Sequence, residues 1–297
     1  MSSIIAFIRR HPVPAYYVLV FAISLSGCLV AMGPGGILGT TPISGAQLPL
    51  VYLASLAGPG LAGILLTGLV HGRAGLRNLR FRLLRWRVGV RWYVPVLLIA
   101  PLLMTAILFV LSLTSPVYLP AIVTSDDKTN LLLTGIGVGL VVPIFEELGW
   151  TGFAVPELRK RHGILITGLI AGLLWGVWHF PPFSGAAMSN GAVPPALYLV
   201  VLLFSWLPPY RVLMVWVYDR TQSLLLTMLM HMPIVVGVDP HHENSVGRQP
   251  GEEEHCQVES RRNRFVRHGG TREEREVPHP PQQTRDEPSD EDAMTLS

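Results

Sequence analysis

Apolar runs of about 20 residues recur along the chain up to residue 238, and they restrict its fold more than any other feature. In a helix, about 20 such residues cross the roughly 30 Å of hydrocarbon in a bilayer. Because lipid offers the backbone no hydrogen bonds, only helices and closed barrels span it. The sequence therefore predicts an all-α, polytopic transmembrane helix bundle of about seven spans. The predicted spans cover about residues 16–32, 50–70, 93–113, from 131 to near 159, 164–180, 196–217 and 223–238.

The composition agrees with a membrane protein. Of the 297 residues, 49% are hydrophobic and only 14% are charged, which leaves too few polar side chains to cover a soluble surface. The two cysteines, Cys28 and Cys256, lie far apart, so neither a disulfide framework nor a thiolate metal site is predicted. The first apolar run also resembles a signal peptide, and residues 25–28 resemble a lipoprotein cleavage box. Because several more apolar runs follow, we interpret it as the first span.

The distribution of basic residues predicts how the spans are oriented. Cytoplasmic loops carry an excess of Lys and Arg, which also lie against anionic headgroups. Residues 159–161 are basic, whereas the loops at 33–49 and 181–193 carry no charge. We therefore expect a cell-membrane protein with a cytoplasmic N-terminus, in contact with the lipid bilayer and not with nucleic acid. The most basic loop, between the second and third spans, contains Arg73, Arg77, Arg80, Arg82, Arg85, Arg87 and Arg91.

The character of the chain changes at Asp239. Residues 239–297 contain few apolar side chains, so they cannot bury enough surface to offset the entropy of ordering. We divide the chain into a transmembrane domain, residues 1–238, and a disordered polar tail, residues 239–297. A frameshifted or truncated gene is a second interpretation of the tail. The tail contains four side chains of types that can bind metals, but they follow no regular ligand spacing, so no metal site is predicted there. They are His241, His242, His255 and Cys256.

Two adjacent carboxylates, Glu146 and Glu147, follow the apolar residues 131–144. An ionised carboxylate in hydrocarbon costs at least a few kcal/mol, so it persists mainly where it faces a protein cavity. Adjacent helical residues differ by about 100° in direction, so one carboxylate is expected to face the cavity and the other to support it. Thr151 lies four residues after Glu147 and can offer it a hydroxyl. Trp150 lies four residues after Glu146 and can wall the site.

Two histidines occupy later apolar runs, His179 in the fifth span and His231 in the last. A single histidine in an apolar helix is usually a satisfied core residue. Two of them, together with a pair of carboxylates, indicate a water-activating site inside the bundle.

Small residues predict where helices approach each other. Glycines recur every four residues in the fifth span, and such a ridge allows close packing. We expect it to let the helix that bears Glu146 lie near the helix that bears His179. Pro181 and Pro182 are expected to end the fifth span. The ridge consists of Gly168, Gly172 and Gly176.

Three motifs follow one another in the last 108 residues of the transmembrane domain, about residues 131–238. They are the Glu146-Glu147 pair with aromatic residues after it, Trp175-x-x-x-His179, and His231-x-x-x-Val235. In this order they resemble the CAAX prenyl protease-like, bacteriocin-processing (CPBP) intramembrane proteases. The stretch from residue 211 to residue 224 also resembles the segment that precedes the last histidine in that family.

The resemblance implies an intramembrane endopeptidase that acts on a membrane-associated peptide or protein substrate. Glu146 and His179 would position and deprotonate a water, His231 would bind the oxyanion, and Glu147 would support the site. Family enzymes have been discussed both as metalloproteases and as glutamate-dependent proteases. In the first case zinc is the cofactor, and Glu146, His179 and His231 would be its ligands.

The chain departs from the family pattern at two motif positions. Thr151 stands where many relatives have Arg, so Glu147 lacks that charged partner, and Arg211 is the candidate substitute. Val235 stands where Asn or Asp would add an oxyanion donor. A third departure is the polar tail, which stands where the family usually has one more hydrophobic helix. The three departures keep open a second interpretation, a non-catalytic membrane scaffold or immunity-type relative. A proton-coupled transporter is a third, because buried Glu and His also carry protons, but the chain shows no internal repeat.

Overall fold

The structure of the protein is a computed structural model that describes residues 2–113, 121–189 and 207–236. These residues form helices and turns without any strand, which confirms the predicted all-α class. The predicted tail and residues 190–206 and 237–238 of the transmembrane domain lie outside the described residues. The helices are α1 (Ser2–Arg10), α2 (Pro12–Ile37), α3 (Leu48–Leu83), η1 (Val90–Trp92), α4 (Tyr93–Ser112), α5 (Ala121–Thr124), α6 (Lys128–Gly149), η3 (Trp150–Ala154), α7 (Val155–Arg159), α8 (Ile164–Ser189), α10 (Leu207–Thr221) and α11 (Leu224–Val236).

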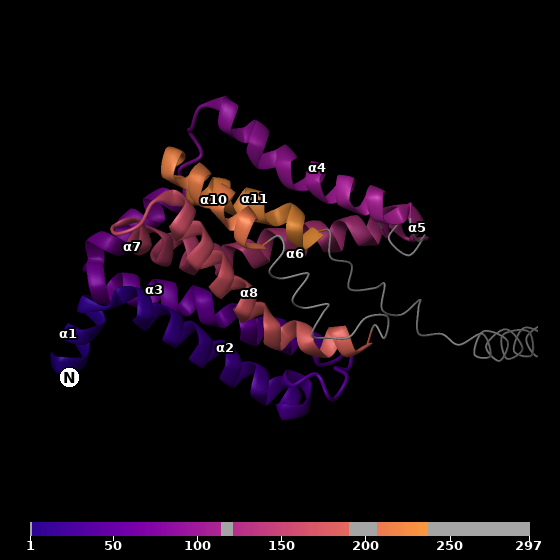
Figure 1. Cartoon of the computed structure of the whole chain (residues 1–297), viewed down its shortest axis with the longest axis horizontal. Helices are drawn as coiled ribbons and strands as arrows, with labels where there is room; N and C mark the ends of the chain where they lie inside the picture. The colour runs from indigo at the N-terminus through magenta and orange to yellow at the C-terminus, as the bar shows by residue number, and fades with distance from the viewer. Residues whose placement is uncertain (1, 114–120, 190–206, 237–297) are drawn as a thin grey trace, which may run out of the picture. The chain divides into compact units, whose positions relative to one another are not determined.

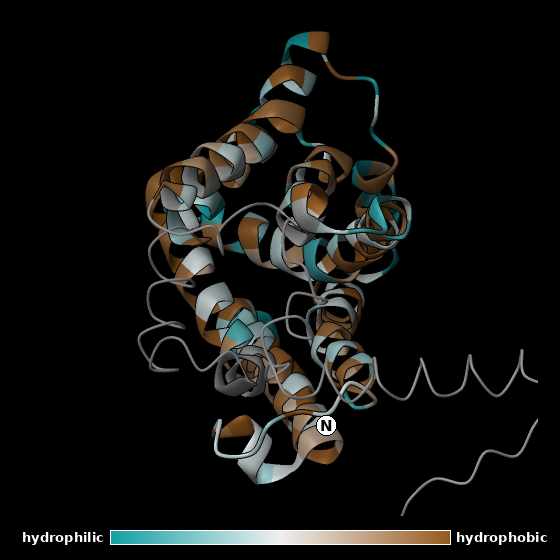
Figure 2. Cartoon of the chain, turned by 90° about the vertical axis from the view of Figure 1, so that its right-hand side faces the viewer, coloured by the Kyte–Doolittle hydropathy of each residue, from teal (hydrophilic) through white to brown (hydrophobic). Residues whose placement is uncertain are grey.

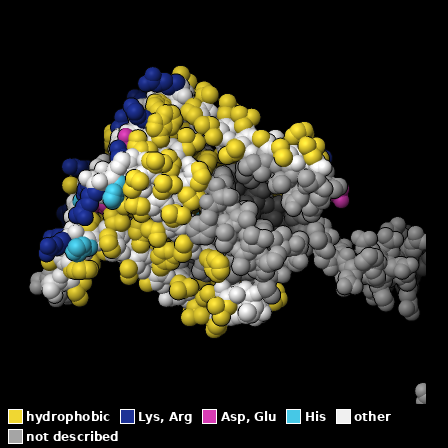
Figure 3. Space-filling model, in the orientation of Figure 1, with side chains coloured by type: hydrophobic (Ala, Val, Ile, Leu, Met, Phe, Trp, Pro, Cys, Tyr) yellow, Lys and Arg dark blue, Asp and Glu magenta, His cyan; other side chains and the backbone are white. Residues whose placement is uncertain are grey.

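Three helical segments are long and apolar enough to cross a membrane, namely Pro12–Ile37, Leu48–Leu83 and Lys128–Arg159. The last of these joins α6, η3 and α7. Figure 2 shows hydrophobic residues along most of the helices, and Figure 3 shows hydrophobic side chains over much of one face. A polytopic helix bundle is therefore confirmed. The count of seven spans and their orientation stay predictions.

The bundle is built from a few extensive helix contacts. α2 packs against α3, α3 packs against α6, and α6 packs against α11 (Figure 1). α8 packs against both α10 and α2. The core between these helices is rich in buried aromatic side chains, which contribute large apolar areas of about 150–250 Å² each. They include Tyr16, Tyr17, Trp150, Phe153, Trp175 and Trp178.

Glycine lets α3 approach α6 just after the Glu pair. A Cβ atom added to Gly149 would lie 2.2 Å from the carbonyl oxygen of Pro59. One added to Gly63 would lie 2.6 Å from the Cα atom of Gly149. Non-bonded carbon atoms pack at about 3.5–4.0 Å, so only glycine fits at either position. This contact fixes the depth of the carboxylates relative to α3.

The glycine ridge of α8 faces α10. A Cβ atom on Gly168 would lie 2.4 Å from the Cα atom of Val212, and one on Gly172 would lie 2.5 Å from the Cα atom of Pro208. The close approach is confirmed, and the helix directly against the ridge is α10, which brings Arg211 against α8. Small residues set a short distance and carry no information about which helix lies against them. The expected proximity of the helices that bear Glu146 and His179 is also found, because Trp175 of α8 donates to Glu146 at 2.6 Å.

Two predicted loops are partly helical. α3 continues through the first half of the basic loop to Leu83, after a break at Gly72 whose φ of 63° and ψ of −157° favour glycine. α8 continues to Ser189, so the expectation that Pro181 and Pro182 end this helix was wrong. A proline removes one backbone hydrogen bond, yet helices in apolar bundles tolerate it where neighbouring groups compensate.

Basic side chains gather at one end of the described helices. Figure 3 shows Lys, Arg and His at the end where α1 and α7 lie in Figure 1. Arg9 and Arg10 end α1, and Arg80 and Arg82 lie in the last turn of α3. This segregation agrees with the positive-inside distribution expected from the sequence.

Candidate active site

The Glu pair lies at the C-terminal end of α6, in the interior of the bundle. Glu146 is 2% exposed and Glu147 is fully buried. The chain then widens into the π-helical turn η3, which buries Trp150, Thr151 and Phe153. Such turns inside longer helices frequently occur at functional sites. Both carboxylates therefore depend on protein partners for their hydrogen bonds.

Glu147 is held by three side chains from three helical elements. Thr151 donates its hydroxyl to Oε2 at 2.5 Å, and Arg211 Nη1 lies 2.8 Å from Oε2 and 3.0 Å from Oε1. The His231 Nδ1 atom lies 2.8 Å from Oε1. The hydroxyl of Thr151 and the ion pair with Arg211 are both as expected from the sequence. A buried charge with this many partners is fixed in place, and removal of one partner would leave the charge uncompensated.

Glu146 has one anchored oxygen. The Trp175 indole donates to Oε2 at 2.6 Å, and His231 Nε2 lies 3.9 Å from the same oxygen. Within the part of the chain that the structure describes, Oε1 accepts no hydrogen bond. His231 thus lies between the two carboxylates, with one ring nitrogen toward each. Adjacent residues of one helix share a site here because a histidine from α11 bridges them.

His179 lies beside this centre on α8. Its Nδ1 atom is 2.8 Å from the backbone oxygen of Trp175, which can only accept, so Nδ1 carries the proton and Nε2 is the basic nitrogen of the neutral ring. Its ring lies 5.3 Å from the Trp175 ring and 4.8 Å from the Trp178 ring. The four residues predicted from the sequence therefore lie in one region, with His179 linked to the others through Trp175.

Trp175 connects more parts of the centre than any predicted residue. Its indole nitrogen binds Glu146, and its backbone oxygen binds His179. The guanidinium of Arg211 lies 4.0 Å from the centre of its ring, and the His231 ring lies 5.1 Å away. A cation stacked on a desolvated indole is stabilised by about 2 kcal/mol. The sequence showed only that Trp175 shares a helix face with His179.

An aromatic layer closes one side of the centre. Trp150, which was predicted to wall Glu146, packs against Tyr16, Tyr17 and Trp178 at ring distances of 5.7, 5.8 and 5.8 Å. The Trp178 indole donates to Ser24 Oγ at 2.9 Å. α2 thus contributes to the surroundings of the site, which no motif in the sequence indicated.

The donor groups do not assemble a metal site in this geometry. Among the described residues, no group of three or more His, Cys, Asp or Glu side chains is arranged to hold a metal ion. Nδ1 of His231 is engaged by Glu147, and the Glu146 oxygen nearest to His231 is engaged by Trp175. The zinc ligand set of Glu146, His179 and His231 stays a prediction, and we derive no step through a metal ion.

A buried cluster of carboxylates, histidines and one arginine inside an apolar bundle is typical of membrane proteins whose functional site lies within the bilayer. Comparison with known proteins narrows this class. Residues 128–236 match the family model described as type II CAAX prenyl endopeptidase Rce1-like. This segment runs from α6 to α11 and contains the whole Glu, His and Arg centre.

One curated relative is CAAX prenyl protease 2 of Methanococcus maripaludis. It is 26% identical over 97 residues, which cover 32% of this chain and 36% of the relative. The chain thus spans about a third of that relative's length in the comparison. The predicted resemblance to CAAX proteases is confirmed for the matched segment, and it supports a membrane-embedded protease at the level of the family.

Proposed function

We propose that the protein is an intramembrane endopeptidase that hydrolyses a peptide bond with a water activated by Glu146 and His179. The observation that carries the proposal is the carboxylate of Glu146. It is buried, Trp175 anchors one of its oxygens, and the other accepts no hydrogen bond from the described residues, so it is the candidate acceptor for a water. A positioned general base of this kind accelerates hydrolysis by about 10²- to 10⁴-fold.

The positions of the side chains support the following reaction. Glu146 takes a proton from the water, and the water oxygen bonds to the peptide carbonyl carbon. His231 donates from Nε2 to the oxyanion while its Nδ1 atom is held by Glu147. When the C–N bond breaks, Glu146 returns this proton to the leaving amine. Nε2 of His179 is a second basic site that can hold the same proton between the two steps.

The ion pair of Glu147 and Arg211 orients the histidine. Glu147 contacts His231 at 2.8 Å and Arg211 at 2.8 Å, with all three side chains buried. This ion pair supports Arg211 as the substitute for the arginine that the family resemblance places at the position of Thr151. Of the three features that favour a non-catalytic scaffold, it bears on Thr151 and leaves Val235 and the polar tail.

The family match and the position of the site inside an apolar bundle support a proposal for the substrate class. We propose a peptide segment of a membrane-associated protein, and a prenylated C-terminal segment is the first candidate. A bacteriocin leader and a membrane anchor are the others. A substrate with a lipid chain would reach the site from the bilayer.

The test is cleavage of prenylated and unprenylated membrane peptides by the purified protein in liposomes. Wild type is compared with Glu146→Gln and His179→Ala at equal folded amounts. Glu157→Gln is the matched control, because Glu157 is also buried on the same helical segment but lies outside the centre. Loss of cleavage in the first two variants alone supports the proposal, and full activity of Glu146→Gln would overturn it.

Two further arms separate the alternatives. Removal of metal by a chelator, with zinc added back, distinguishes a metalloprotease from a glutamate-dependent one. Proton-coupled uptake by the same liposomes without cleavage would instead identify a transporter. Neither activity, across the whole substrate panel, would favour the scaffold.

A further inference from the structure

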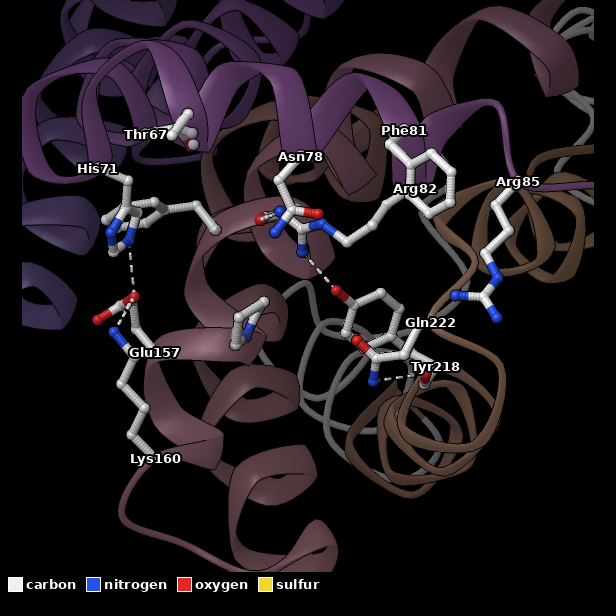
Figure 4. Close-up of a pocket in the computed structure, with 15 residues that line it drawn as sticks. Thr67, His71, Asn78, Phe81, Arg82, Arg85, Glu157, Lys160, Tyr218 and Gln222 are labelled. Atoms are coloured by element: carbon white, nitrogen blue, oxygen red, sulfur yellow. Dashed lines mark hydrogen bonds and ion pairs between the residues drawn. The ribbon is translucent and has the colours of Figure 1, made fainter.

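A second polar site lies at the basic end of the bundle. It is a cavity of about 550 Å³ lined by α3, the turn η3, α7 and the end of α10 (Figure 4). None of the residues that line it belongs to the Glu and His centre. The proposed function therefore does not use it.

On one side of this cavity the charged side chains are paired with one another. The Oε1 atom of Glu157 lies 2.9 Å from His71 Nε2 and 2.6 Å from Lys160 Nζ. Figure 4 shows this cluster on one side of the pocket. Its negative charge is neutralised locally, so it does not prevent an anion from binding farther along the cavity.

The other side has an excess of positive charge. Arg82 donates to the Gly152 carbonyl oxygen at 2.9 Å and to the Tyr218 hydroxyl, both neutral acceptors, so its charge is not compensated. Its Nε atom is buried and has no hydrogen-bond partner within the described residues. Arg85 is exposed, and its side chain makes no ion pair or hydrogen bond with the parts of the chain that the structure covers.

A neutral donor completes this side. The Asn78 amide also lines the cavity, and Figure 4 shows it beside Arg82. The Gln222 amide lines the cavity as well but donates to the backbone oxygens of Tyr218 and Asp219. Arginine presents a planar fork of N–H groups that matches a phosphate or carboxylate better than a point charge does. Two guanidinium groups with a neighbouring amide suit a tetrahedral oxyanion such as a phosphate.

The surface beside the cavity is apolar. Phe81 is 63% exposed, Leu84 is 65% exposed and Trp86 is 58% exposed, and arginines lie between them in the last turn of α3 and the residues that follow it. A segment with large apolar side chains and arginines lies at the membrane interface, with the apolar groups in the acyl region and the charges among the headgroups. A phosphate that reaches this cavity from the interface would carry acyl chains.

We propose that the cavity binds the phosphate of an anionic glycerophospholipid headgroup, held by Arg82 and Arg85. The exposed Phe81 and Trp86 then lie beside the acyl chains. Because Arg82 also holds the Gly152 carbonyl, a bound lipid stabilises the turn that follows Thr151. The site thus links the composition of the inner leaflet to the segment that carries the Glu pair.

The experiment measures retention of short-chain phosphatidylglycerol by the purified full-length protein in neutral detergent, with native mass spectrometry. Arg85→Gln is expected to weaken apparent binding about tenfold, the loss of one charge-assisted hydrogen bond. Arg77→Gln is the matched control, because Arg77 is an exposed arginine of α3, the helix that ends two residues before Arg85, and it does not line the cavity. We expect less than a twofold change from this control. Arg82→Gln is a second test variant.

Two other ligands distinguish the sources of phosphate. Short-chain phosphatidylcholine, which has no net charge, is expected to bind at least tenfold more weakly than phosphatidylglycerol. Inorganic phosphate at millimolar concentration is expected neither to compete nor to raise the Tm.

Three results would overturn the proposal. The first is an equal loss in Arg77→Gln and Arg85→Gln, which would indicate unspecific surface charge. The second is full retention of phosphatidylglycerol by both Arg82→Gln and Arg85→Gln. The third is competition by inorganic phosphate that depends on Arg85, which would identify a site for free phosphate rather than lipid.

Discussion

The buried centre and the basic cavity lie along the same helical segment, yet their charged side chains differ in whether they are paired. In the centre, Glu147 faces Arg211 and His231 at 2.8 Å each, and all three side chains are shielded from water. In the cavity, Arg82 and Arg85 have neutral partners or none within the described residues. The first site is closed by its own side chains, and the second leaves charge available to a ligand.

The difference reflects the surroundings of each site. A charge in a low-dielectric interior needs an internal partner, because water cannot reach it. A cation at the interface is solvated by water, so it needs no internal partner and its charge costs little free energy in the absence of a ligand. Side chains that are all paired with one another hold a fixed geometry, which a catalytic site needs. Arginines without an anionic partner can bind an anionic lipid when the membrane contains one.

The largest effect is expected from the general base. Glu146→Gln keeps the size of the side chain and an acceptor for Trp175 but removes the proton acceptor, so cleavage should fall by about 10²- to 10⁴-fold. Glu157→Gln removes a buried carboxylate from the cavity and should change cleavage by less than about threefold. Initial rates in liposomes measure both. Equal losses would mean that burial of any carboxylate on this segment, and not chemistry, explains the effect.

The next largest effect concerns stability. Arg211→Met leaves Glu147 buried without its ion-pair partner, which should cost about 3–5 kcal/mol of unfolding free energy. The pair of Arg159 and Asp219 is partly exposed, and Arg159→Met should cost about 1 kcal/mol or less. Denaturant unfolding in detergent measures both.

A double variant sharpens this result. Thr151→Arg combined with Arg211→Met moves the guanidinium to the position that relatives use, and we expect it to regain a large part of the lost stability. No recovery would show that Arg211 acts mainly through its stacking on Trp175.

An intermediate effect is expected from the two indoles of α8. Trp175→Phe removes a hydrogen bond to a carboxylate, worth about 1.5–3 kcal/mol, so kcat should fall by about 10- to 100-fold. Trp178→Phe removes a bond to the neutral hydroxyl of Ser24, and its effect on kcat should stay within about threefold. If the two variants lose the same activity, aromatic packing matters more than the anchoring of Glu146.

The smallest effect separates the sites by ionic strength. Raising NaCl from about 0.05 to about 0.5 M shortens the Debye length and should weaken phosphatidylglycerol retention roughly threefold. The unfolding free energy contributed by the buried ion pair should hardly change, since salt does not enter the core. A salt-dependent contribution of Arg211, measured as the difference between wild type and Arg211→Met, would contradict the closed geometry of the centre.

Much of this arrangement follows from the sequence because it depends on local spacing. The apolar runs predict the helices, and the four-residue offset between Glu147 and Thr151 predicts their hydrogen bond. Arg211 could be predicted as a partner because a buried carboxylate needs a cation and few cations occur in apolar runs.

The rest depends on contacts between helices, which spacing does not encode. The glycine ridge predicted a close approach, but only the fold shows that α10 fills it. The bond from Trp178 to Ser24 joins residues 154 positions apart. Nothing in the sequence marks the cavity, because its lining comes from α3, η3, α7 and the end of α10. In the sequence the arginines there indicate only the orientation of the spans.

The contact of Gly149 with Pro59 and Gly63 has a genetic consequence. A methyl group at Gly149 would push α6 away from α3 and shift both carboxylates, although it touches no reacting atom. In a selection for loss-of-function alleles, Gly149 and Gly63 should therefore recur alongside Glu146 and His179. Such alleles would disturb the packing of α6 against α3 and not the chemistry, and compensating changes in α3 would be expected among revertants.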